Sequence, residues 1–289
     1  MSIENGRSDC HIHMVLDGAD WRSAIARFSA GANEAAVRST LLHYRELGYT
    51  YLRDGGDRWG AGELAAELSG EYGIVYRTPC FPIYKEGHYG SFIGRSWSND
   101  SEYRALLSQA EKRGAHFIKL MISGLMDFNQ FGVITGEPYP AEDIRMMIGE
   151  AHDRGFAVMA HANGDAAVFA AAAAGVDSVE HGAYLSDETL CAMAESGTVW
   201  VPTLAAVAML SGCGRFPESV LEPLTALQME KVRKAAALGV PLACGSDAGA
   251  FRVPHGQGGL DEYALLARAI GAGAGELIAA GNAIIREKF

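Results

Sequence analysis

The segment SDCHIHMVL, residues 8–16, places two histidines within an otherwise apolar run and predicts a buried β-strand. Alternate side chains of a strand share a face, so we expect His11 and His13 to point together while Cys10 and Ile12 point the other way. Two imidazoles on one face of a buried strand are either hydrogen-bonded polar side chains or ligands of a metal ion.

One pattern recurs along the chain, beginning with this segment. It consists of a short apolar run, then turn residues, then a longer helical pattern. Eight runs are predicted as strands, at residues 10–15, 50–54, 74–79, 116–121, 157–162, 178–182, 199–203 and 241–246. Several of the helical segments begin at a capping residue or Pro and end at Gly, as helices commonly do. The pattern predicts an α/β fold, a (β/α)8 TIM barrel that forms a single domain over residues 1–289. A doubly wound sheet is the alternative, but it usually has a glycine-rich phosphate loop after its first strand, which this chain lacks.

The composition bears on the class of partner. The chain has 289 residues, of which 49% are hydrophobic, and a formal net charge of -11. An acidic chain without a basic patch is not expected to bind nucleic acid or an anionic membrane, so a small-molecule substrate is expected. The sequence has no apolar stretch of membrane-spanning length, and its start, MSIENGRSD, lacks the apolar core of a signal peptide. Five scattered cysteines without a CxxC pair indicate reduced thiols, and together these features predict a cytoplasmic protein.

Residues suited to metal binding or acid–base chemistry recur where the predicted strands end. Strands one, four, five, six and eight contribute, in chain order, His11 and His13, Lys119, His161, His181 and Asp247. The carboxyl ends of barrel strands open onto the loops that form active sites, so we expect these six residues to converge. Histidine nitrogen and carboxylate oxygen are suitable ligands for zinc or another divalent first-row ion.

Lys119 is the unusual member of this set. A free ammonium with a pKa of about 10.4 would be disfavoured by burial and by a neighbouring divalent cation. We expect its amine to take up carbon dioxide, because the resulting carbamate has two oxygens that can bridge two metals. A core lysine paired with a carboxylate and a Schiff-base lysine, as in barrel aldolases, are the alternatives.

Taken in order, the HxH pair, Lys, His, His and Asp resemble the ligand set of the amidohydrolase superfamily, and the resemblance extends from Asp9 to about Gly281. Six motifs look like its imidazolonepropionase and prolidase-type branch, namely YLRDGG (51–56), FIKLMISG (117–124), AHANG (160–164), VEHGAYL (179–185), GSDAG (245–249) and VPHG (253–256). A lone HxH pair is a weak signal, but all these elements in this order are a strong one.

The resemblance implies a centre of two divalent metal ions, taken to be Zn2+. It implies that His11, His13 and Asp247 bind the more buried ion, that His161 and His181 bind the second, and that carboxylated Lys119 bridges them. The implied activity is that of an amidohydrolase, which cleaves a C–N bond in the amide or cyclic amide of a small molecule such as a dipeptide or N-acyl amino acid. Metal-activated hydroxide would attack the carbonyl, and Asp247 would carry its proton to the leaving nitrogen.

The same residues leave other reactions open. Phosphotriesterase-like members of the superfamily use the same ligands, so ester hydrolysis of the lactonase or phosphotriesterase type is an alternative. A Schiff-base lyase that uses Lys119 is another, and a metal-binding barrel without catalysis is a third. DGG after strand two and PHG after strand eight favour the prolidase-type branch.

Five further residues are candidate substrate contacts, because they stand at a strand end or in a following loop. Arg53 would pair with a substrate carboxylate or, alternatively, form a structural salt bridge with a neighbouring Asp. His88 and His255 lie in glycine-rich loops, where they either reach substrate or serve as turn residues. Tyr84 and Tyr184 would line the pocket or remain exposed on loops.

Members of this branch usually carry a longer segment before the HxH strand, which builds a small β-sandwich together with residues after the barrel. Only ten residues precede His11 here, so we expect a barrel without that sandwich. An apolar patch left on the side of the barrel would be covered by a second subunit, which predicts a homo-oligomer.

Overall fold

Strands and helices alternate along residues 6–289, which are the residues described by the computed structural model. The strands are β1 (Arg7–Ile12), β2 (Tyr49–Asp54), β3 (Val75–Arg77), β4 (Pro82–Lys85), β5 (Arg95–Trp97), β6 (Ile118–Met121), β7 (Val158–Ala162), β8 (Ser178–His181) and β9 (Val199–Val201). The helices are α1 (Trp21–Ala26), α2 (Glu34–Glu46), α3 (Ala61–Leu68), the short 3-10 helix η2 (Ser69–Tyr72), α4 (Asp100–Lys112), α5 (Ala141–His152), α6 (Asp165–Ala173), α7 (Asp187–Ser196), α8 (Ala205–Ala208), α9 (Glu218–Leu238), α10 (Gln257–Ile270) and α11 (Ala274–Lys288). The predictions for residues 1–289 as one domain and for the absence of a signal peptide include residues 1–5, which lie outside the described residues.

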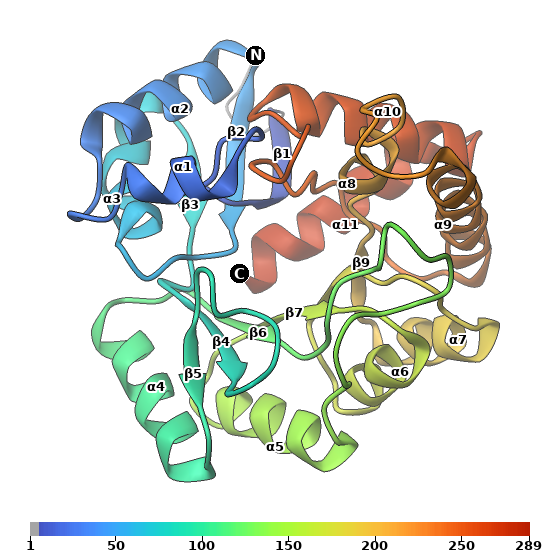
Figure 1. Cartoon of the computed structure of the whole chain (residues 1–289), viewed down its shortest axis with the longest axis horizontal. Coiled ribbons are helices and arrows are strands. Elements are labelled where there is room, and N and C mark those ends of the chain that lie inside the picture. Colours follow the sequence, from blue (N-terminus) through green and yellow to red (C-terminus); the bar gives the residue numbers. More distant parts are fainter. Residues whose placement is uncertain (1–5) are drawn as a thin grey trace.

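All the pairings between these strands are parallel, which confirms the predicted α/β class. One sheet has the order β1-β2-β3 and the other the order β5-β4-β6-β7-β8-β9. The two sheets are joined on one side where the His116 backbone N–H donates to the Thr78 carbonyl over 3.0 Å, between the end of β3 and the start of β6. Figure 1 shows the helices arranged around these strands.

The predicted eighth strand joins the sheets on the other side, but it forms only isolated bridges. Its residues pair with β9 at Trp200↔Leu242 and with β1 at Ile12↔Ala248, both in parallel. A regular ladder does not form because the Asp9 carboxylate, rather than a backbone carbonyl, accepts the Ser246 N–H over 2.9 Å. The same carboxylate also accepts the Ser246 hydroxyl over 2.6 Å, so a side chain from β1 holds this segment.

The strand predicted at residues 74–79 is shorter in the structure, where β3 covers Val75–Arg77 and a separate strand follows a turn. After β3 the chain turns at Cys80, whose φ is 63°, and continues as β4. In the register of the second sheet, Pro82 of β4 lies beside Lys119 of β6, and β5 adds to the outer edge of β4. Residues 82–85 and 95–97 were not predicted as strands, since each run is too short to show a period.

The helices follow the predicted patterns and begin at side chains that satisfy free backbone N–H groups. Asn33, Asn99 and Ser186 each accept a backbone N–H from the first turn of the helix that follows. Helix α9 begins at Glu218 and includes Pro223 near its start. No helix within residues 6–289 combines the length and apolarity of a membrane span.

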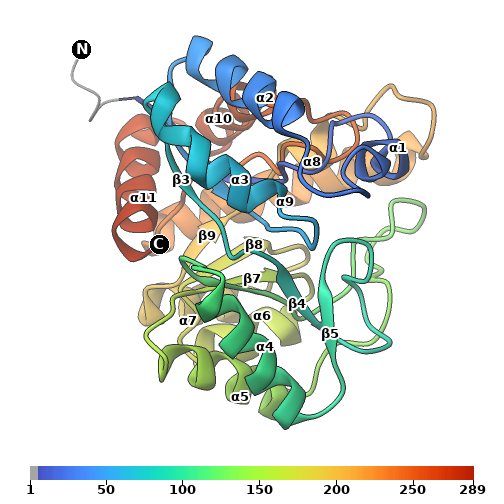
Figure 2. The same ribbon diagram turned by 90° about the vertical axis from the view of Figure 1, so that its left-hand side faces the viewer.

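Helix α11 covers the amino-terminal ends of the strands. Its Ile285 and the following Phe289 are buried in a cluster with Tyr51 and Phe117. Figures 1 and 2 agree that this helix lies across one end of the strands, whereas α1 and the longer loops lie at the other end. The carboxyl ends of the strands therefore face these loops, and they carry the residues described below.

Gly281 provides a test of the packing of α11 against the eighth segment. A Cβ at Gly281 would come within 2.0 Å of the Leu242 carbonyl oxygen, and backbone cannot move aside cheaply. We expect Gly281→Ala to lower the free energy of unfolding by about 1–3 kcal/mol in urea denaturation. Gly149→Ala is the matched control, because the helix position is exposed and open, and it should stabilise by about 0.5–1 kcal/mol. Equal effects of the two substitutions would contradict this packing.

Candidate metal centre

Three of the predicted ligands meet at the carboxyl end of β1. The Nε2 atoms of His11 and His13 are 3.4 Å apart, so both imidazoles point to one place as the strand period predicts. An Asp247 carboxylate oxygen lies 3.5 Å from the first of these nitrogens and 3.2 Å from the second. Ligand atoms of the three residues all lie within 4.8 Å of one another, the arrangement of a site for one metal ion.

The backbone around these ligands explains how they are held. The Asp247 N–H donates to the His11 carbonyl over 2.8 Å, which ties the eighth segment to β1 beside the two histidines. Asp247 itself has a φ of 62°, in the left-handed region that non-glycine residues rarely adopt. A Cβ at Gly55 would lie 2.3 Å from the His13 ring, so only glycine after β2 leaves room for this imidazole.

His161 and His181 extend the cluster. The ring centroids lie 5.1 Å apart for His11 and His181, and 4.6 Å apart for His181 and His161. His161 donates from Nε2 to the Gly124 carbonyl over 3.0 Å, which leaves its Nδ1 as the nitrogen with a free lone pair. The His181 Nδ1 contacts the Thr203 hydroxyl at 2.8 Å, so its Nε2 is the nitrogen left for a ligand.

Lys119 lies in the middle of β6 with its side chain almost completely buried. Its exposed fraction is 1%, and its Nζ has no hydrogen-bond partner within residues 6–289. Burial lowers the pKa of this amine to about 8, the charge of Glu180 opposes the shift, and the charge of Arg53 adds to it. A buried amine without a partner is costly, and such an amine has the character of a nucleophile rather than of a structural cation.

The electrostatics of the cluster favour the protonation states that metal ligands need. Burial lowers the pKa of His161 to about 3 and those of His11 and His181 well below the usual range, which keeps the imidazoles neutral. Burial by itself would raise the pKa of Asp247, but the hydrogen bond with His13 and the neighbouring charges lower it. Neutral imidazole and ionised carboxylate are the forms that bind divalent ions.

Glu180 fixes the orientation of His11 and was not identified from the sequence. One of its carboxylate oxygens accepts the His11 Nδ1–H over 2.8 Å, which turns the lone pair of Nε2 toward His13 and Asp247. The other oxygen accepts from Arg53 over 2.8 Å and from the Ser178 hydroxyl over 2.6 Å. Both Glu180 and Arg53 are fully buried. A carboxylate beside a ligand histidine is the usual way in which a ligand's tautomer is fixed.

Arg53 is a structural residue in this arrangement and not a substrate contact. Its guanidinium donates to Glu180, to the Ser178 hydroxyl over 2.9 Å and to the Cys10 carbonyl over 2.7 Å. The alternative that the sequence left open, a structural salt bridge, is the one observed. Its partner is Glu180 of β8 rather than a neighbouring Asp, because the arginine points into the space between the strands.

His255 is near the cluster, but both of its ring nitrogens have partners in the protein. Its Nε2 donates to the Leu16 carbonyl over 2.9 Å, and its Nδ1 lies 3.2 Å from the Tyr44 hydroxyl. Burial lowers its pKa to about 4, so it is a neutral residue that holds the loop after β1. Tyr184 similarly serves a neighbouring loop, since its hydroxyl accepts the Gly132 N–H over 2.9 Å.

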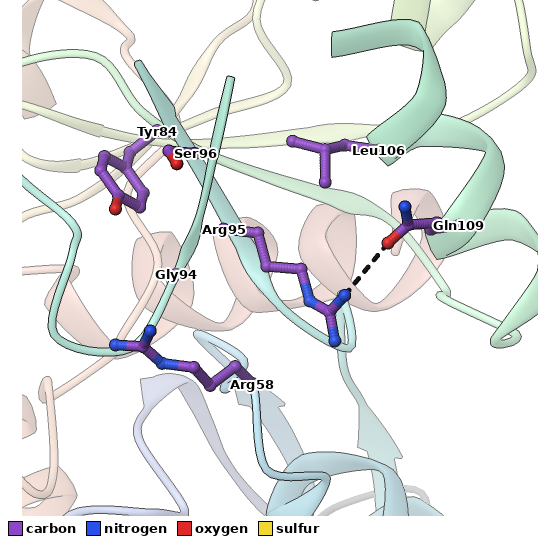
Figure 3. Close-up of a pocket in the computed structure, with 7 residues that line it drawn as sticks. All are labelled: Arg58, Tyr84, Gly94, Arg95, Ser96, Leu106 and Gln109. Carbon is purple, nitrogen blue, oxygen red and sulfur yellow. Dashed lines mark hydrogen bonds between the residues drawn. The ribbon is translucent and has the colours of Figure 1, made fainter. Parts of the chain in front are cut away.

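The remaining two predicted contacts line separate cavities. Tyr84 lines a surface cavity of about 410 Å³ together with Arg58 and Arg95, and Figure 3 shows that no histidine is among the residues drawn there. His88 lines another cavity, of about 560 Å³, which also includes Tyr89 and Gly124. The second cavity adjoins the candidate metal centre, because Gly124 accepts from His161 and the Tyr89 ring lies 4.9 Å from the His161 ring.

The sequence of this chain is similar to a protein family and to several curated proteins. The model of the Amidohydrolase family matches residues 9–279. An uncharacterized protein of Mycobacterium tuberculosis is 33% identical over 177 residues, which are 59% of this chain and 46% of that protein. Ochratoxinase of Aspergillus niger is 27% identical over 287 residues, with 84% of this chain and 57% of the enzyme covered. The chain thus spans about half the length of the curated relatives it matches.

Solved structures show the same fold. A Xaa-Pro dipeptidase with methionine in its active site superimposes with a TM-score of 0.78 at 21% identity, over 98% of this chain and 75% of that one. The A. niger ochratoxinase structure also gives 0.78, at 22% identity, over 96% of this chain and 71% of the other.

The contact between Glu180 and His11 leads to a prediction about metal affinity. In Glu180→Gln the side chain keeps its shape, but its amide can donate to His11 and Arg53 loses its charged partner. We expect the affinity for Zn2+, measured by competition with a chromogenic chelator, to fall by about ten- to a hundredfold. The free energy of unfolding should also fall, by about 3–5 kcal/mol, because a buried ion pair is broken.

The matched control is Glu262→Gln, which removes a buried carboxylate that accepts the Ala205 N–H and contacts no histidine. We expect it to leave zinc affinity within about twofold of the unaltered chain, since it lies outside the hydrogen bonds that orient the ligands. Equal zinc affinities for Glu180→Gln and Glu262→Gln would argue against the orienting role.

Proposed function

This chain belongs to the amidohydrolase family, and from that premise we propose that it is a metal-dependent hydrolase that cleaves a carbon–nitrogen bond in a small amide. The substrate class that we propose is a dipeptide, an N-acyl amino acid or a cyclic amide. The observation that carries the proposal is the meeting of His11, His13 and Asp247 with ligand atoms within 4.8 Å of one another. Family membership supports the hydrolase class, and the prolidase-like neighbours support the kind of bond.

We propose that the strands form a closed (β/α)8 barrel of one domain. Two observations support closure on both sides. The His116 backbone N–H donates to the Thr78 carbonyl, and residues 242 and 248 form bridges to β9 and β1. In a barrel the carboxyl ends of the strands form one mouth. The proposal therefore accounts for the five strand ends that contribute to one cluster.

The donor set fits a centre of two divalent ions, for which we propose Zn2+. His11, His13 and Asp247 would hold one ion, His161 and His181 the other, and Lys119 as a carbamate would bridge them. The partnerless, buried Nζ of Lys119 supports this, because an uncharged amine adds to carbon dioxide and releases one proton as the carbamate forms. When bound, the ions would acidify water and polarise a carbonyl oxygen.

Asp247 is the residue placed to move protons. Its carboxylate lies 3.2 Å from the His13 Nε2 and retains 15% side-chain exposure, so it faces the mouth as well as the ligands. We propose that it accepts a proton from the attacking water and delivers it to the leaving nitrogen. Burial raises the pKa of this carboxyl, but the hydrogen bond with His13 and the neighbouring charges together outweigh that effect and lower it, so Asp247 begins the cycle as the base.

A Schiff-base lyase is the second candidate, and the environment of Lys119 is the observation that favours it. The burial that lowers the pKa of this amine to about 8 would also make it a good nucleophile toward a carbonyl substrate. The lyase reaction needs no metal ion. It therefore gives the four clustered histidines no role, which favours the hydrolase. Ester hydrolysis of the lactonase or phosphotriesterase type uses the same proposed ligands and is separated only by the choice of substrate.

The first test concerns turnover. We expect the zinc-loaded protein to hydrolyse at least one member of a panel of dipeptides and N-acyl amino acids, with lactones and phosphotriesters as the comparison set. Asp247→Asn should lower kcat by about two to four powers of ten, because the proton carrier is lost. Asp187→Asn, which alters an exposed acidic residue paired with Lys231 and Lys234, should leave kcat unchanged. Preferential turnover of lactones or phosphotriesters would redirect the proposal to ester hydrolysis.

The second test concerns Lys119. We expect nuclear magnetic resonance with isotopically labelled carbon dioxide to show one carbamate, which disappears in Lys119→Met. Borohydride added with substrate should leave the mass of the protein unchanged, and a chelator should abolish activity. Covalent trapping of substrate on Lys119, together with insensitivity to chelators, would establish the lyase instead.

The expectations about partners stay predictions. They comprise a small-molecule substrate, assembly as a homo-oligomer, and no nucleic-acid or membrane partner.

A further inference from the structure

A cavity of about 560 Å³ adjoins the candidate metal centre and has no assigned occupant. It lies between the loop that follows β4 and the segment that follows β6, and its lining includes His88, Tyr89, Gly124 and Thr135. Gly124 connects it to the cluster, because the carbonyl of this residue accepts from both His161 and the Asn163 amide. A substrate group bound in this cavity would therefore lie next to a substrate bond placed at the clustered histidines.

One wall of the cavity belongs to a flap formed by residues 123–137. Its two arms run antiparallel, with a bridge at Met126↔Ile134 and a Thr135 N–H that donates to the Leu125 carbonyl over 2.7 Å. A Cβ at Gly124 would lie 1.5 Å from the Thr135 carbonyl oxygen, so the arms can approach this closely only with glycine there. The flap is thus a built element with a fixed position.

The tip of the flap exposes large apolar side chains. The exposed fractions of Leu125, Phe131 and Val133 are 36%, 47% and 39%. The Phe131 ring packs edge-on against Tyr184, with centroids 5.7 Å apart, which brings the tip over the loop after β8. These side chains belong to the flap that contributes the cavity wall, and exposed apolar side chains that gather in one place commonly mark a binding surface.

A row of aromatic rings runs from solvent to the histidines, and one member of the row, Tyr89, lines the cavity. Trp21 of α1 is exposed and contacts Phe92 at a centroid distance of 5.9 Å, Phe92 contacts Tyr89 at 5.5 Å, and Tyr89 contacts His161 at 4.9 Å. These residues come from α1 and from the loop after β4, which lie apart in the sequence. The rings therefore form a chain of aromatic contacts that ends at a proposed ligand.

The polar groups of the cavity do not favour an anion. Its lining within the described residues contains Glu137 but neither lysine nor arginine. The Glu137 carbonyl already accepts the His88 Nδ1–H over 3.2 Å, and Gly124 is occupied by His161 and Asn163. The described lining thus offers no lysine or arginine to pair with a carboxylate, and a carboxylate bound without a paired cation is costly to desolvate.

We propose that this cavity binds an uncharged apolar group of the substrate, aromatic or branched aliphatic, on one side of the bond to be cleaved. The proposal rests on the proposed function for the identity of that bond, and it adds the class of substrate. A substrate carboxylate then lies on the other side of the bond, away from Tyr89 and the flap.

The test compares three probes that share a hydroxamate head. Acetohydroxamate carries a methyl group, phenylacetohydroxamate an aromatic group, and succinic monohydroxamate a carboxylate. Kd is measured by calorimetry on the zinc-loaded and on the metal-free protein. We expect phenylacetohydroxamate to bind about ten- to fiftyfold more tightly than acetohydroxamate, as burial of a phenyl ring predicts, and succinic monohydroxamate to bind most weakly. This order should hold for both forms of the protein, because the cavity does not contain the metal.

Variants assign the preference to the cavity. Tyr89→Ala should reduce the preference for the phenyl probe, taken as the ratio of the Kd values of acetohydroxamate and phenylacetohydroxamate, to less than about threefold. Phe92→Ala removes the ring that packs against Tyr89 and should reduce the same ratio to a smaller extent. Leu238→Ala, which removes an exposed apolar side chain at the end of α9, should leave the preference intact. Equal affinities for the three probes, or a preference that survives both aromatic substitutions, would overturn the inference.

The effect of zinc on the binding of acetohydroxamate tests the proposed function separately from the cavity. If zinc fails to tighten the binding of acetohydroxamate, the proposed metal-dependent function is wrong, whereas the order of the three probes still decides the nature of the cavity.

Discussion

The candidate site depends on the contacts of the Glu180 carboxylate with Arg53 and His11. This carboxylate is fully buried between the strands, where a charge is tolerated only if it is paired and fully hydrogen-bonded. Arg53 and Ser178 satisfy one oxygen and His11 satisfies the other. Each charge of the Arg53–Glu180 pair is therefore satisfied inside the sheet, and Glu180 also sets the tautomer of His11, a proposed ligand. A buried ion pair adds little net stability, so its clearest contribution is to geometry.

The motif YLRDGG (51–56) shows how one short segment holds the proposed metal ligands of a different segment, β1. Arg53 binds Glu180, Asp54 accepts the Met14 N–H over 3.1 Å, and Gly55 leaves the space that the His13 ring occupies. All three contacts hold β1 or its histidines, although none of the three residues is a proposed ligand. Strain adds to this precision, because His181 and Asp247 both adopt positive φ at strand ends. Such conformations persist only where the surrounding structure holds them, and they often occur at functional sites.

The residues that pack the interior and the residues of the candidate site lie at opposite ends of the strands. Helix α11 and the cluster around Phe117 and Phe289 fill the amino-terminal end, where apolar packing excludes water. The Arg53–Glu180 pair lies between this cluster and the histidines, and the Arg53 guanidinium lies 4.4 Å from the centre of the Phe289 ring. The loops, the flap and the aromatic row lie at the opposite end. Changes in these loops can therefore alter the substrate without disturbing the ligands.

The sequence by itself determined the alternation of strands and helices and the positions of the six polar residues at strand ends, but not the short strands β4 and β5. Both follow from local rules, since the period of two in a strand and the capping residues of helices depend only on neighbours in the chain. It did not determine the break in the eighth strand, the partner of Arg53 or the role of Glu180. Those depend on contacts between residues far apart in the chain, such as Asp9 with Ser246 and His11 with Glu180. The cavity at the flap was decided in the same way, because Tyr89 and His161 become neighbours only when β4 and β7 are placed on either side of β6.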